Sequence, residues 1–285
     1  MTMWVEYRLM RTLRFVVPLL LLAAASFAQS APQYEIYALR YATVPSFAVS
    51  ELVPGADPAR KIDIAMLVWL VRGGGHTILV DSGFHHDHYI KEWNVHDYIK
   101  PSEAVGKLGV KPEEITDVVI SHMHWDHAGS IDLFPKARVW IQKDEYHFYT
   151  GEAWQSKNDS DGIDPKDVLA LVKANTEGRV GLVDGDAREI IPGITCYIGG
   201  KHTYQSQYVG VNTKAGIVVL ASDNVYLYEN LEKHVPIAET LDAASNLRAQ
   251  DRMKQLATSK LIIPGHDPAV MTKFPGVAPG VVRIE

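Results

Sequence analysis

The sequence has little of what a disulfide framework, a nucleic-acid surface or a membrane span requires. Cysteine occurs once in 285 residues, at Cys196, so no internal disulfide can form. Lys and Arg number 28 against 34 Asp and Glu, and the net charge of −6 disfavours phosphate-rich partners, so no nucleic-acid partner is expected. The composition, 47% hydrophobic and 22% charged, is typical of a globular protein with an ample core.

The longest apolar run, Phe15 to Ala25, has only about eleven residues, too few to cross a bilayer core of roughly 30 Å as a helix. Three arginines precede it and the small-x-small sequence Ser26-Phe27-Ala28 follows it, a pattern typical of a signal peptide. We expect cleavage after Ala28, no stable membrane insertion of the mature chain, and a periplasmic or secreted location. An uncleaved anchor and translation from Met10 are the alternatives.

Apolar periodicity predicts strands and helices in alternation. Residues 64–71 are almost continuously apolar, as expected of a strand buried on both faces, and the glycines at 73–75 lead into a second strand, so the pair indicates a hairpin. Strands are expected at 76–81, 118–120, 137–141, 189–191, 195–198, 208–211, 216–221 and 261–263. Helices are expected at 102–109 with Ser102 as cap, at 144–148, and at 240–257 with Leu241, Ala244, Leu247 and Met253 on its apolar face, and a surface excursion at 151–168.

No repeat, low-complexity block or long linker divides the chain. Strands followed by a helix, twice over, suit a core of two sheets with helices outside. We therefore expect a signal peptide over residues 1–28 and a single domain over residues 29–285. Cys196 falls within a predicted strand and is expected to be a buried structural thiol rather than a nucleophile.

The segment Ser121 to Gly129, with the sequence SHMHWDHAG, carries the strongest chemical signal. His122 and His124 follow a predicted strand and are two residues apart, so on an extended backbone their side chains project to the same side. Asp126 and His127 come next, where the chain should turn into a helix. Three imidazoles and one carboxylate in so short a segment suit Zn²⁺ and similar metals better than Ca²⁺ or Mg²⁺.

An H-x-H-x-D-H motif at a strand end resembles the signature of the metallo-β-lactamase superfamily, and the resemblance covers about residues 35–275. It implies an α+β fold, the αβ/βα four-layer sandwich, with a dinuclear metal site at the edge where the two sheets meet. The remaining ligands of that family come from later strand ends, where this chain has His202, Asp223 and His266. The resemblance thus implies one metal on His122, His124 and His202, and a second on Asp126, His127 and His266, with Asp223 bridging. Zinc is the expected metal of both sites, although Mn, Fe and Co accept the same ligands.

Three other segments bear on the resemblance: one departs from the family pattern, one matches it, and one is a further histidine cluster. The family commonly has Gly-His-Thr-Pro-Gly-His, whereas this chain has Lys201 before the histidine and Tyr204-Gln205-Ser206 after the threonine; we expect the ligand set to be complete and the loop to differ. Asp81 matches the Val-Asp-x-Gly turn of the family and is expected to orient a ligand imidazole or to support the metal loop. For the cluster at residues 85–88, His-His-Asp-His, a solvated face or a rim of the substrate pocket is favoured over a third metal.

The expected chemistry is hydrolysis of an ester. Two metals about 3.5–4 Å apart can share a hydroxide that attacks a carbonyl carbon, while the metals polarise the carbonyl oxygen and receive the leaving alkoxide. Asp126 is placed to orient the nucleophile or to shuttle its proton. Tyr226 follows Asp223 at the offset of a tyrosine that hydrogen-bonds the lactone in N-acyl homoserine lactonases, and packing under the site is its alternative role. The branch that the chain most resembles is therefore the lactonases, whose ring opening is known as quorum quenching.

Other readings of the same residues stay open. Asp223 argues against the true β-lactamases, and the acidic charge argues against the RNA-processing branch. The same metal site would also serve another lactone, a carboxylic ester or a phosphoester, and a non-catalytic member would bind a metal or small ligand without turnover. Trp125 and the segment 44–47, placed in an early loop, are candidates for the apolar wall of a substrate pocket, with plain core packing as the alternative. Acyl-chain length and oligomeric state stay undetermined.

Overall fold

The computed structural model describes residues 31–156 and 159–285. The segment expected to be a signal peptide, residues 1–28, lies outside the described residues. Residues Ala31–Glu285 cluster into one compact unit. No helix in the described part of the chain is long and apolar enough to cross a membrane.

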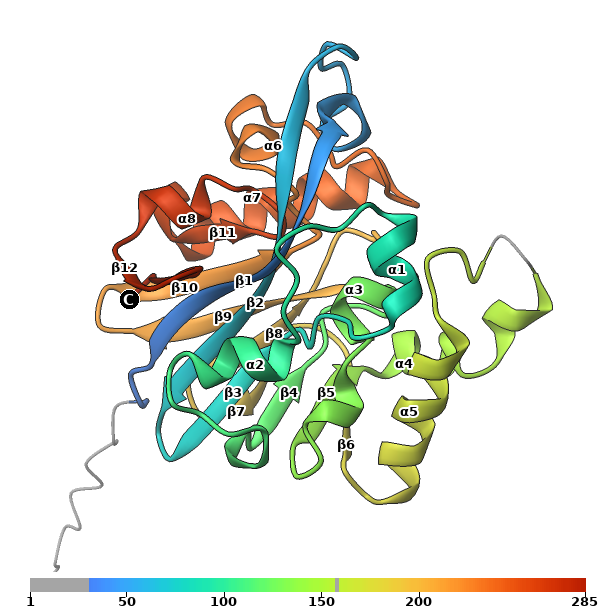
Figure 1. Cartoon of the computed structure of the whole chain (residues 1–285), viewed down its shortest axis with the longest axis vertical. Helices are drawn as coiled ribbons and strands as arrows, with labels where there is room; N and C mark the ends of the chain where they lie inside the picture. Colours follow the sequence, from blue (N-terminus) through green and yellow to red (C-terminus); the bar gives the residue numbers. More distant parts are fainter. Residues whose placement is uncertain (1–30, 157–158) are drawn as a thin grey trace, which may run out of the picture. The chain divides into compact units, whose positions relative to one another are not determined.

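Two β-sheets lie face to face at the centre of the fold (Figure 1). Within the described residues, one sheet has eight strands in the order β12-β13-β1-β2-β3-β4-β5-β6 and the other has five in the order β11-β10-β9-β8-β7. The strands are β1 (Glu35–Ala48), β2 (Lys61–Gly73), β3 (His76–Val80), β4 (Asp117–Val119), β5 (Arg138–Gln142), β6 (Val180–Val183), β7 (Arg188–Ile191), β8 (Ile194–Ile198), β9 (Gln207–Thr213), β10 (Gly216–Ser222), β11 (Ile262–Pro264), β12 (Gly276–Ala278) and β13 (Val281–Arg283). Strands β2 and β3 pair antiparallel, which confirms the predicted hairpin, whereas β3 to β6 run parallel.

Helices cover the outer face of each sheet (Figure 1). They are α1 (Asp87–Glu92), α2 (Pro101–Gly106), α3 (Trp125–Ala128), α4 (Lys143–Tyr149), α5 (Pro165–Thr176), α6 (Tyr228–Lys233), α7 (Ala243–Leu256) and α8 (Val270–Lys273), with short 3₁₀ helices at Val49–Glu51, Pro112–Glu114, Ile131–Leu133, Glu152–Gln155 and Ser259–Leu261. Side chains of α1 to α5 join the core on the larger sheet, and those of α6 and α7 join the core on the smaller one. The predicted four-layer αβ/βα sandwich is confirmed.

Strand β2 is continuously apolar from Ile64 to Val71 because its two faces belong to different cores. Leu67 and Trp69 pack between the two sheets, whereas Met66 and Val68 pack under the helices of the larger sheet. Successive side chains of a strand point to opposite faces. Where both faces are covered, every position is buried and apolar side chains are favoured throughout. Cys196 of β8 is fully buried between the sheets, as predicted, and burial raises the pKa of its thiol.

Three local predictions are wrong. Helix α2 begins with Pro101 at its first position and Lys100 as cap, not with Ser102, because the fixed φ of proline suits the first turn. The segment 44–47 lies within β1 and not in a loop, with a bulge between Val44 and Phe47 where the pairing with β2 shifts register. The excursion predicted over 151–168 ends at Asp164, whose side chain accepts from the Lys166 amide and caps α5.

The apolar face predicted for α7 is right for Met253, which is fully buried, but wrong for Leu241 and Ala244, which are exposed. The helix begins after Asp242, and Leu241, just before it, is 70% exposed. The buried face instead carries Asn246, Ala249, Gln250 and Met253. Two of these four side chains are polar, so hydrophobic periodicity alone could not find this face.

Candidate metal centre

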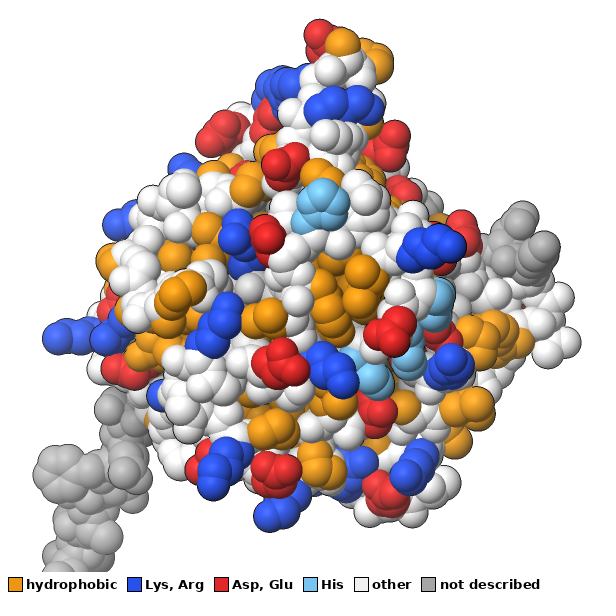
Figure 2. Space-filling view, in the orientation of Figure 1, with side chains coloured by type: hydrophobic (Ala, Val, Ile, Leu, Met, Phe, Trp, Pro, Cys, Tyr) orange, Lys and Arg blue, Asp and Glu red, His pale blue; other side chains and the backbone are white. Residues whose placement is uncertain are grey.

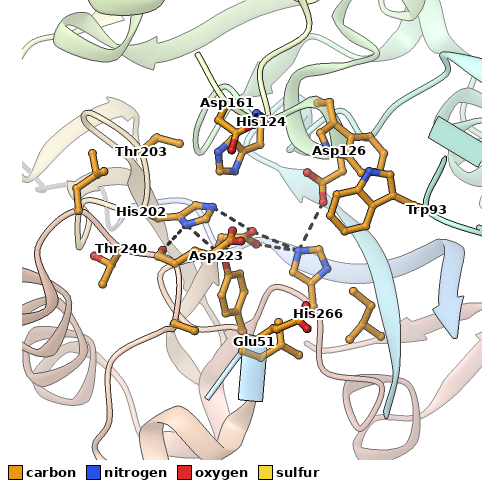
Figure 3. Close-up of a pocket in the computed structure, with 18 of the residues that line it drawn as sticks. Glu51, Trp93, His124, Asp126, Asp161, His202, Thr203, Asp223, Thr240 and His266 are labelled. Carbon is orange, nitrogen blue, oxygen red and sulfur yellow. Dashed lines mark hydrogen bonds and ion pairs between the residues drawn. The ribbon is translucent and has the colours of Figure 1, made fainter. Parts of the chain in front are cut away.

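Strand ends from both sheets meet at one edge and carry the seven predicted ligands. The loop after β4 carries His122 and His124 and leads into α3, which holds Asp126 and His127. The other three residues follow later strands: His202 comes after β8, Asp223 after β10 and His266 after β11. Segments far apart in the sequence thus bring their side chains into one space (Figure 3).

The seven side chains form two groups, and in each group the potential ligand atoms lie within 4.8 Å of one another. The first group is His122, His124, His202 and Asp223, and the second is Asp126, His127 and His266. Asp223 lies between the groups: its Oδ2 is 3.4 Å from His202 Nε2 and its Oδ1 is 3.0 Å from His266 Nε2. This grouping is the one that the sequence motifs imply, although the binding of metal by each residue stays a prediction.

Several of these atoms are buried without a hydrogen bond. His127 Nε2, His202 Nε2 and Asp223 Oδ1 contact only one another and the neighbouring side chains of the centre, and none of these contacts has the geometry of a hydrogen bond within the described residues. Leaving such groups bare inside a protein costs free energy, so buried polar atoms nearly always have a partner. Imidazole nitrogens and carboxylate oxygens that face one another in this way fit a divalent metal ion of the zinc type.

The ring nitrogens that face away from the centre are held by the chain. The contacts are His122 Nδ1 with Ser121 Oγ at 2.9 Å, His127 Nδ1 with Asp81 Oδ2 at 2.9 Å, His202 Nδ1 with the Glu239 carbonyl at 2.8 Å, and His266 Nδ1 with the Ala65 carbonyl at 3.1 Å. An Nδ1–H that donates to a carbonyl or carboxylate leaves the Nε2 lone pair free for a metal. The rings are therefore oriented before any metal binds.

Asp81 holds three parts of the centre together. It is fully buried, accepts from the Ser121 amide at 2.7 Å through Oδ1, and accepts from the Ser222 hydroxyl at 2.7 Å through Oδ2. With the bond from His127, it connects the turn after β3, the loop after β4 and the end of β10. The contact predicted between Asp81 and an imidazole of the centre is present, with His127.

The two groups differ in their protonation. Burial and the neighbouring imidazoles lower the pKa of His122 well below 6.5, and burial and His202 lower the pKa of His124 to about 3. At His127, burial acts in the same direction, but the carboxylates of Asp126 and Asp223 outweigh it and raise the pKa well above 6.5. His122 and His124 thus present neutral rings, whereas Asp126, His127 and Asp223 form an imidazole–carboxylate cluster whose protons a bound cation would displace.

Two glycines allow the close approach of these loops. A Cβ at Gly265 would lie 2.5 Å from Asp223 Oδ1, and a Cβ at Gly200 would lie 2.4 Å from the Cα of Asn246. In the loop that carries His202, Lys201 has a left-handed φ of 51°, and the Tyr204 ring stacks on Phe148 with 4.0 Å between ring centroids. This stacking supports the loop.

Glu145 of α4 is a buried residue of the site that sequence reasoning missed. Its Oε1 accepts from the Met123 amide at 3.0 Å and from the Thr203 hydroxyl at 2.7 Å, and its Oε2 accepts from the Gln205 amide at 2.7 Å. One carboxylate thus joins the loop of His122 and His124 to the loop of His202. A glutamate in the first turn of a helix is ordinary in a sequence, so nothing there marked it.

Glu145→Gln is expected to change how stability depends on pH. Burial raises the pKa of Glu145 to about 7 from 4.5, so the stability associated with its proton is present below pH 4.5 and is lost as the pH rises to about 7. The free energy of unfolding of the metal-free wild type should fall by about 3 kcal/mol more than that of the variant between pH 4 and 8. Denaturant melts at several pH values measure this difference, and parallel curves for the two proteins would contradict it.

A cavity of about 840 Å³ opens onto the centre. Its floor includes His124, Asp126, His202, Asp223, Tyr226 and His266, and its walls include Val44, Phe47, Trp93, Trp125, Phe148 and Leu241. Of the candidate wall residues predicted from the sequence, Trp125 and, in the segment 44–47, Val44 and Phe47 line the cavity. Figure 3 shows Trp93 beside Asp126, at the side of the cavity across from Thr203 and Thr240.

Fold and site together define a class of protein: a two-sheet αβ/βα sandwich with a centre for divalent metal ions at one edge. The sequence profile described as the metallo-beta-lactamase superfamily matches residues 66–266. Because this match covers well over half of the chain, the chain belongs to the metallo-beta-lactamase superfamily. The family resemblance predicted from the motifs is confirmed.

Within the superfamily, the chain is similar to several N-acyl homoserine lactonases. The chain is 25% identical over 226 residues to an N-acyl homoserine lactonase of Bacillus cereus, covering 74% of this chain and 84% of that one. It is 28% identical over 231 residues to the N-acyl homoserine lactonase AiiB of Agrobacterium fabrum, covering 73% of this chain and 82% of that one. The crystal structure of a quorum-quenching N-acyl homoserine lactone lactonase matches with a TM-score of 0.70 and 21% identity over 89% of this chain and 99% of that one, which shows a common fold.

Proposed function

We propose that this chain is a metal-dependent lactonase that opens the ring of N-acyl homoserine lactones. The observation that carries the proposal is the hydroxyl of Tyr226 beside the metal centre, at the floor of a cavity with apolar walls. The polar ring of such a substrate fits the floor, and its acyl chain fits walls such as Phe47 and Trp125. The similarity to named lactonases supports the same reaction.

The centre is proposed to hold two divalent ions, with zinc as the native metal. His122, His124 and His202 would hold one ion, Asp126, His127 and His266 would hold the other, and Asp223 would contact both. Ions held there lower the pKa of bound water and polarise an ester carbonyl, which is the chemistry that ring opening needs. Asp126, which lines the cavity, is proposed to orient the attacking water and to carry its proton.

Tyr226 is proposed to hydrogen-bond the lactone carbonyl or the leaving oxygen. Its hydroxyl lies 3.4 Å from both His202 Nδ1 and Glu239 Oε2, distances at which it is weakly held and free to turn toward a ligand. Burial and the charges of Asp223 and Glu239 raise its pKa well above 10, so the hydroxyl keeps its proton and acts as a donor. No step needs Tyr226 as a base.

Tyr226→Phe is expected to lower kcat for the lactone about tenfold, the value of one hydrogen bond to the reacting group, and to leave the metal content unchanged. The matched control is Tyr228→Phe, because Tyr228 is a buried tyrosine two residues later that does not line the cavity of the metal centre. Steady-state kinetics and metal analysis of both variants test the role. Equal kcat values for Tyr226→Phe and the wild type would show that the tyrosine only packs under the site.

Substrate profiling tests the proposed function itself. The purified protein, loaded with zinc, is assayed with short- and long-chain acyl homoserine lactones, a simple lactone without an acyl chain, an aryl ester and a phosphotriester. A kcat/KM highest for the acyl homoserine lactones supports the proposal. A preference for another lactone, ester or phosphoester would keep the metal chemistry and reject the substrate, and bound metal without turnover would indicate a binding protein.

We also propose that the chain is exported to the periplasm or secreted. The support is the arginine-flanked apolar run and the small-x-small sequence that ends at Ala28. Mass spectrometry of the protein recovered outside the cytoplasm should give a mature chain that begins at Gln29. An intact N-terminus on a cytoplasmic protein would reject this part of the proposal.

A further inference from the structure

A second group of imidazoles and carboxylates lies outside the metal centre, between α1 and the start of α5. His86 Nε2 is 2.7 Å from Asp167 Oδ1, and His88 Nε2 is 3.7 Å from Asp164 Oδ2. One potential ligand atom from each of His86, Asp164 and Asp167 lies within 4.8 Å of the other two. Figure 2 shows histidine side chains gathered near α1 on the face in view.

The local structure leaves donor atoms available. Asp164 caps α5 through Oδ1, which accepts from the Lys166 amide at 2.8 Å, so its Oδ2 is not used by the cap. Asp167 is only 2% exposed, and its Oδ2 is a buried atom without a hydrogen-bond partner among the described residues. Within residues 31–156 and 159–285, no Lys or Arg lies within 4.0 Å of either carboxylate.

Few neighbouring groups stabilise the ionised form of Asp167. Burial, together with the nearby charge of Asp164, raises the pKa of Asp167 to about 8. A buried carboxylate that serves only a structural role is normally surrounded by donors. The free energy of this arrangement would fall if a cation joined the two acidic side chains.

Asp117 shows what a satisfied His–Asp pair looks like in the same molecule. Its Oδ2 contacts His76 Nδ1 at 2.9 Å and accepts from the Thr116 hydroxyl at 2.7 Å, and its Oδ1 accepts from Trp140 Nε1 at 2.8 Å. Both oxygens of Asp117 therefore have partners. The pair of His86 and Asp167 differs in its bare oxygen and in the second carboxylate beside it.

We propose that His86, Asp164 and Asp167, with His88 as the fourth donor, form an accessory site for a divalent cation of the zinc type. Two imidazoles and two carboxylates make a mixed N and O donor set that suits zinc better than calcium or magnesium. The His86 side chain is 14% exposed and that of His88 is 50% exposed, so the site is open to solvent on one side. A cation can enter there without unfolding either helix.

The site joins two segments that shape the cavity of the metal centre. Tyr89 of α1 stacks on Trp125 with 4.0 Å between ring centroids, and Trp93, which follows α1, lies 5.4 Å from the same ring. From the segment before α5, the Gly162 carbonyl, two residues before Asp164, accepts from the Trp125 amide at 3.0 Å. A cation at the accessory site would hold α1 and the start of α5 together and fix this wall. That the wall contacts an acyl chain rests on the proposed function, whereas the site itself does not.

Zinc content tests the site without any lactone assay. His86→Gln combined with Asp164→Asn removes two donors, and the asparagine keeps the cap of α5. After exposure to excess Zn²⁺ and gel filtration, the variant should hold one zinc per chain fewer than the wild type. The control His76→Gln removes the histidine of the satisfied pair with Asp117 and should hold as much zinc as the wild type. Equal zinc contents in all three proteins would overturn the proposal.

Two further measurements keep the test decisive if the double variant is unstable. Crystals of the wild type soaked in Zn²⁺ should show an anomalous peak at the zinc edge between His86 Nε2 and the carboxylates, and its absence would overturn the site. In the single variant Asp164→Asn, the rise in Tm on adding Zn²⁺ should be smaller than in the wild type. A rise as large as that of the wild type would also count against the site. A failed lactonase assay leaves all these readouts unaffected.

Discussion

Asp223→Ala is expected to lower kcat/KM for the proposed lactone by about 10³-fold or more, because metal-ion catalysis contributes several kcal/mol to the transition state. Asp223 contacts both groups of histidines, with Oδ2 at 3.4 Å from His202 Nε2 and Oδ1 at 3.0 Å from His266 Nε2. No other side chain in the described residues stands between the groups in this way. Loss of the Asp223 carboxylate therefore removes one donor from each of the two groups. It also removes a negative charge that would balance the bound cations.

Metal analysis and kinetics on the same samples measure the effect. The Asp223→Ala protein should hold less metal than the wild type after dialysis against a weak chelator, and excess Zn²⁺ should restore only part of the activity. The control is Asp184→Ala. Asp184 is an exposed aspartate that pairs with Lys143 and does not line the cavity of the centre. Full metal content and full activity in Asp223→Ala would show that the centre is assigned wrongly.

The candidate centre was predictable from the sequence to the extent that its proposed ligands are contiguous. His122, His124, Asp126 and His127 lie within one strand-end motif, and a strand followed by a short helix leaves few ways to place them. His202 and His266 are single histidines on distant loops, and nothing local distinguishes them from a surface histidine. Only the resemblance to a family connected them to the motif, and the structure brings them to the same edge.

The rest of the site depends on contacts that leave no pattern in the sequence. The carboxylate of Glu145 is buried because donors from three separate positions converge on it, which no periodicity can show. The buried face of α7 was missed for the same reason. Asn246 accepts from the Ile237 amide and Gln250 donates to the Val235 carbonyl, so both polar side chains point inward. A prediction that treats every polar residue as exposed therefore assigns the wrong face of this helix to the core.

The fold followed from the sequence more directly because burial on two faces is visible there. The apolar run in β2 could only be a strand covered on both sides, and this required two cores and helices outside. The bulge in β1 was not visible: Ser46 adopts a left-handed φ of 55° and Pro45 looked like a loop residue. Proline at a bulge is compatible with a strand, so the loop prediction there failed.

Asp81→Ala is expected to lower metal affinity about 10- to 100-fold, the usual effect of removing a residue that orients a metal-binding histidine. The change leaves His127 Nδ1, the Ser121 amide and the Ser222 hydroxyl without their buried acceptor. Asp81 also has a left-handed φ of 57°, which alanine tolerates less well than aspartate or asparagine. A lower Tm should therefore accompany the weaker metal binding in this variant.

Asp81→Asn separates the role in orientation from the role in stability. Asparagine accepts the left-handed backbone and can still accept from the Ser121 amide through its oxygen. Its amide nitrogen would then face His127 Nδ1, and two donors cannot share that contact unless the imidazole moves its proton to Nε2, the atom that faces the centre. We expect a Tm within a few degrees of the wild type but weaker metal binding, measured by competition with a chromophoric chelator. If Asp81→Asn bound metal as tightly as the wild type, Asp81 would serve the fold alone, and the tautomer of His127 would not depend on it.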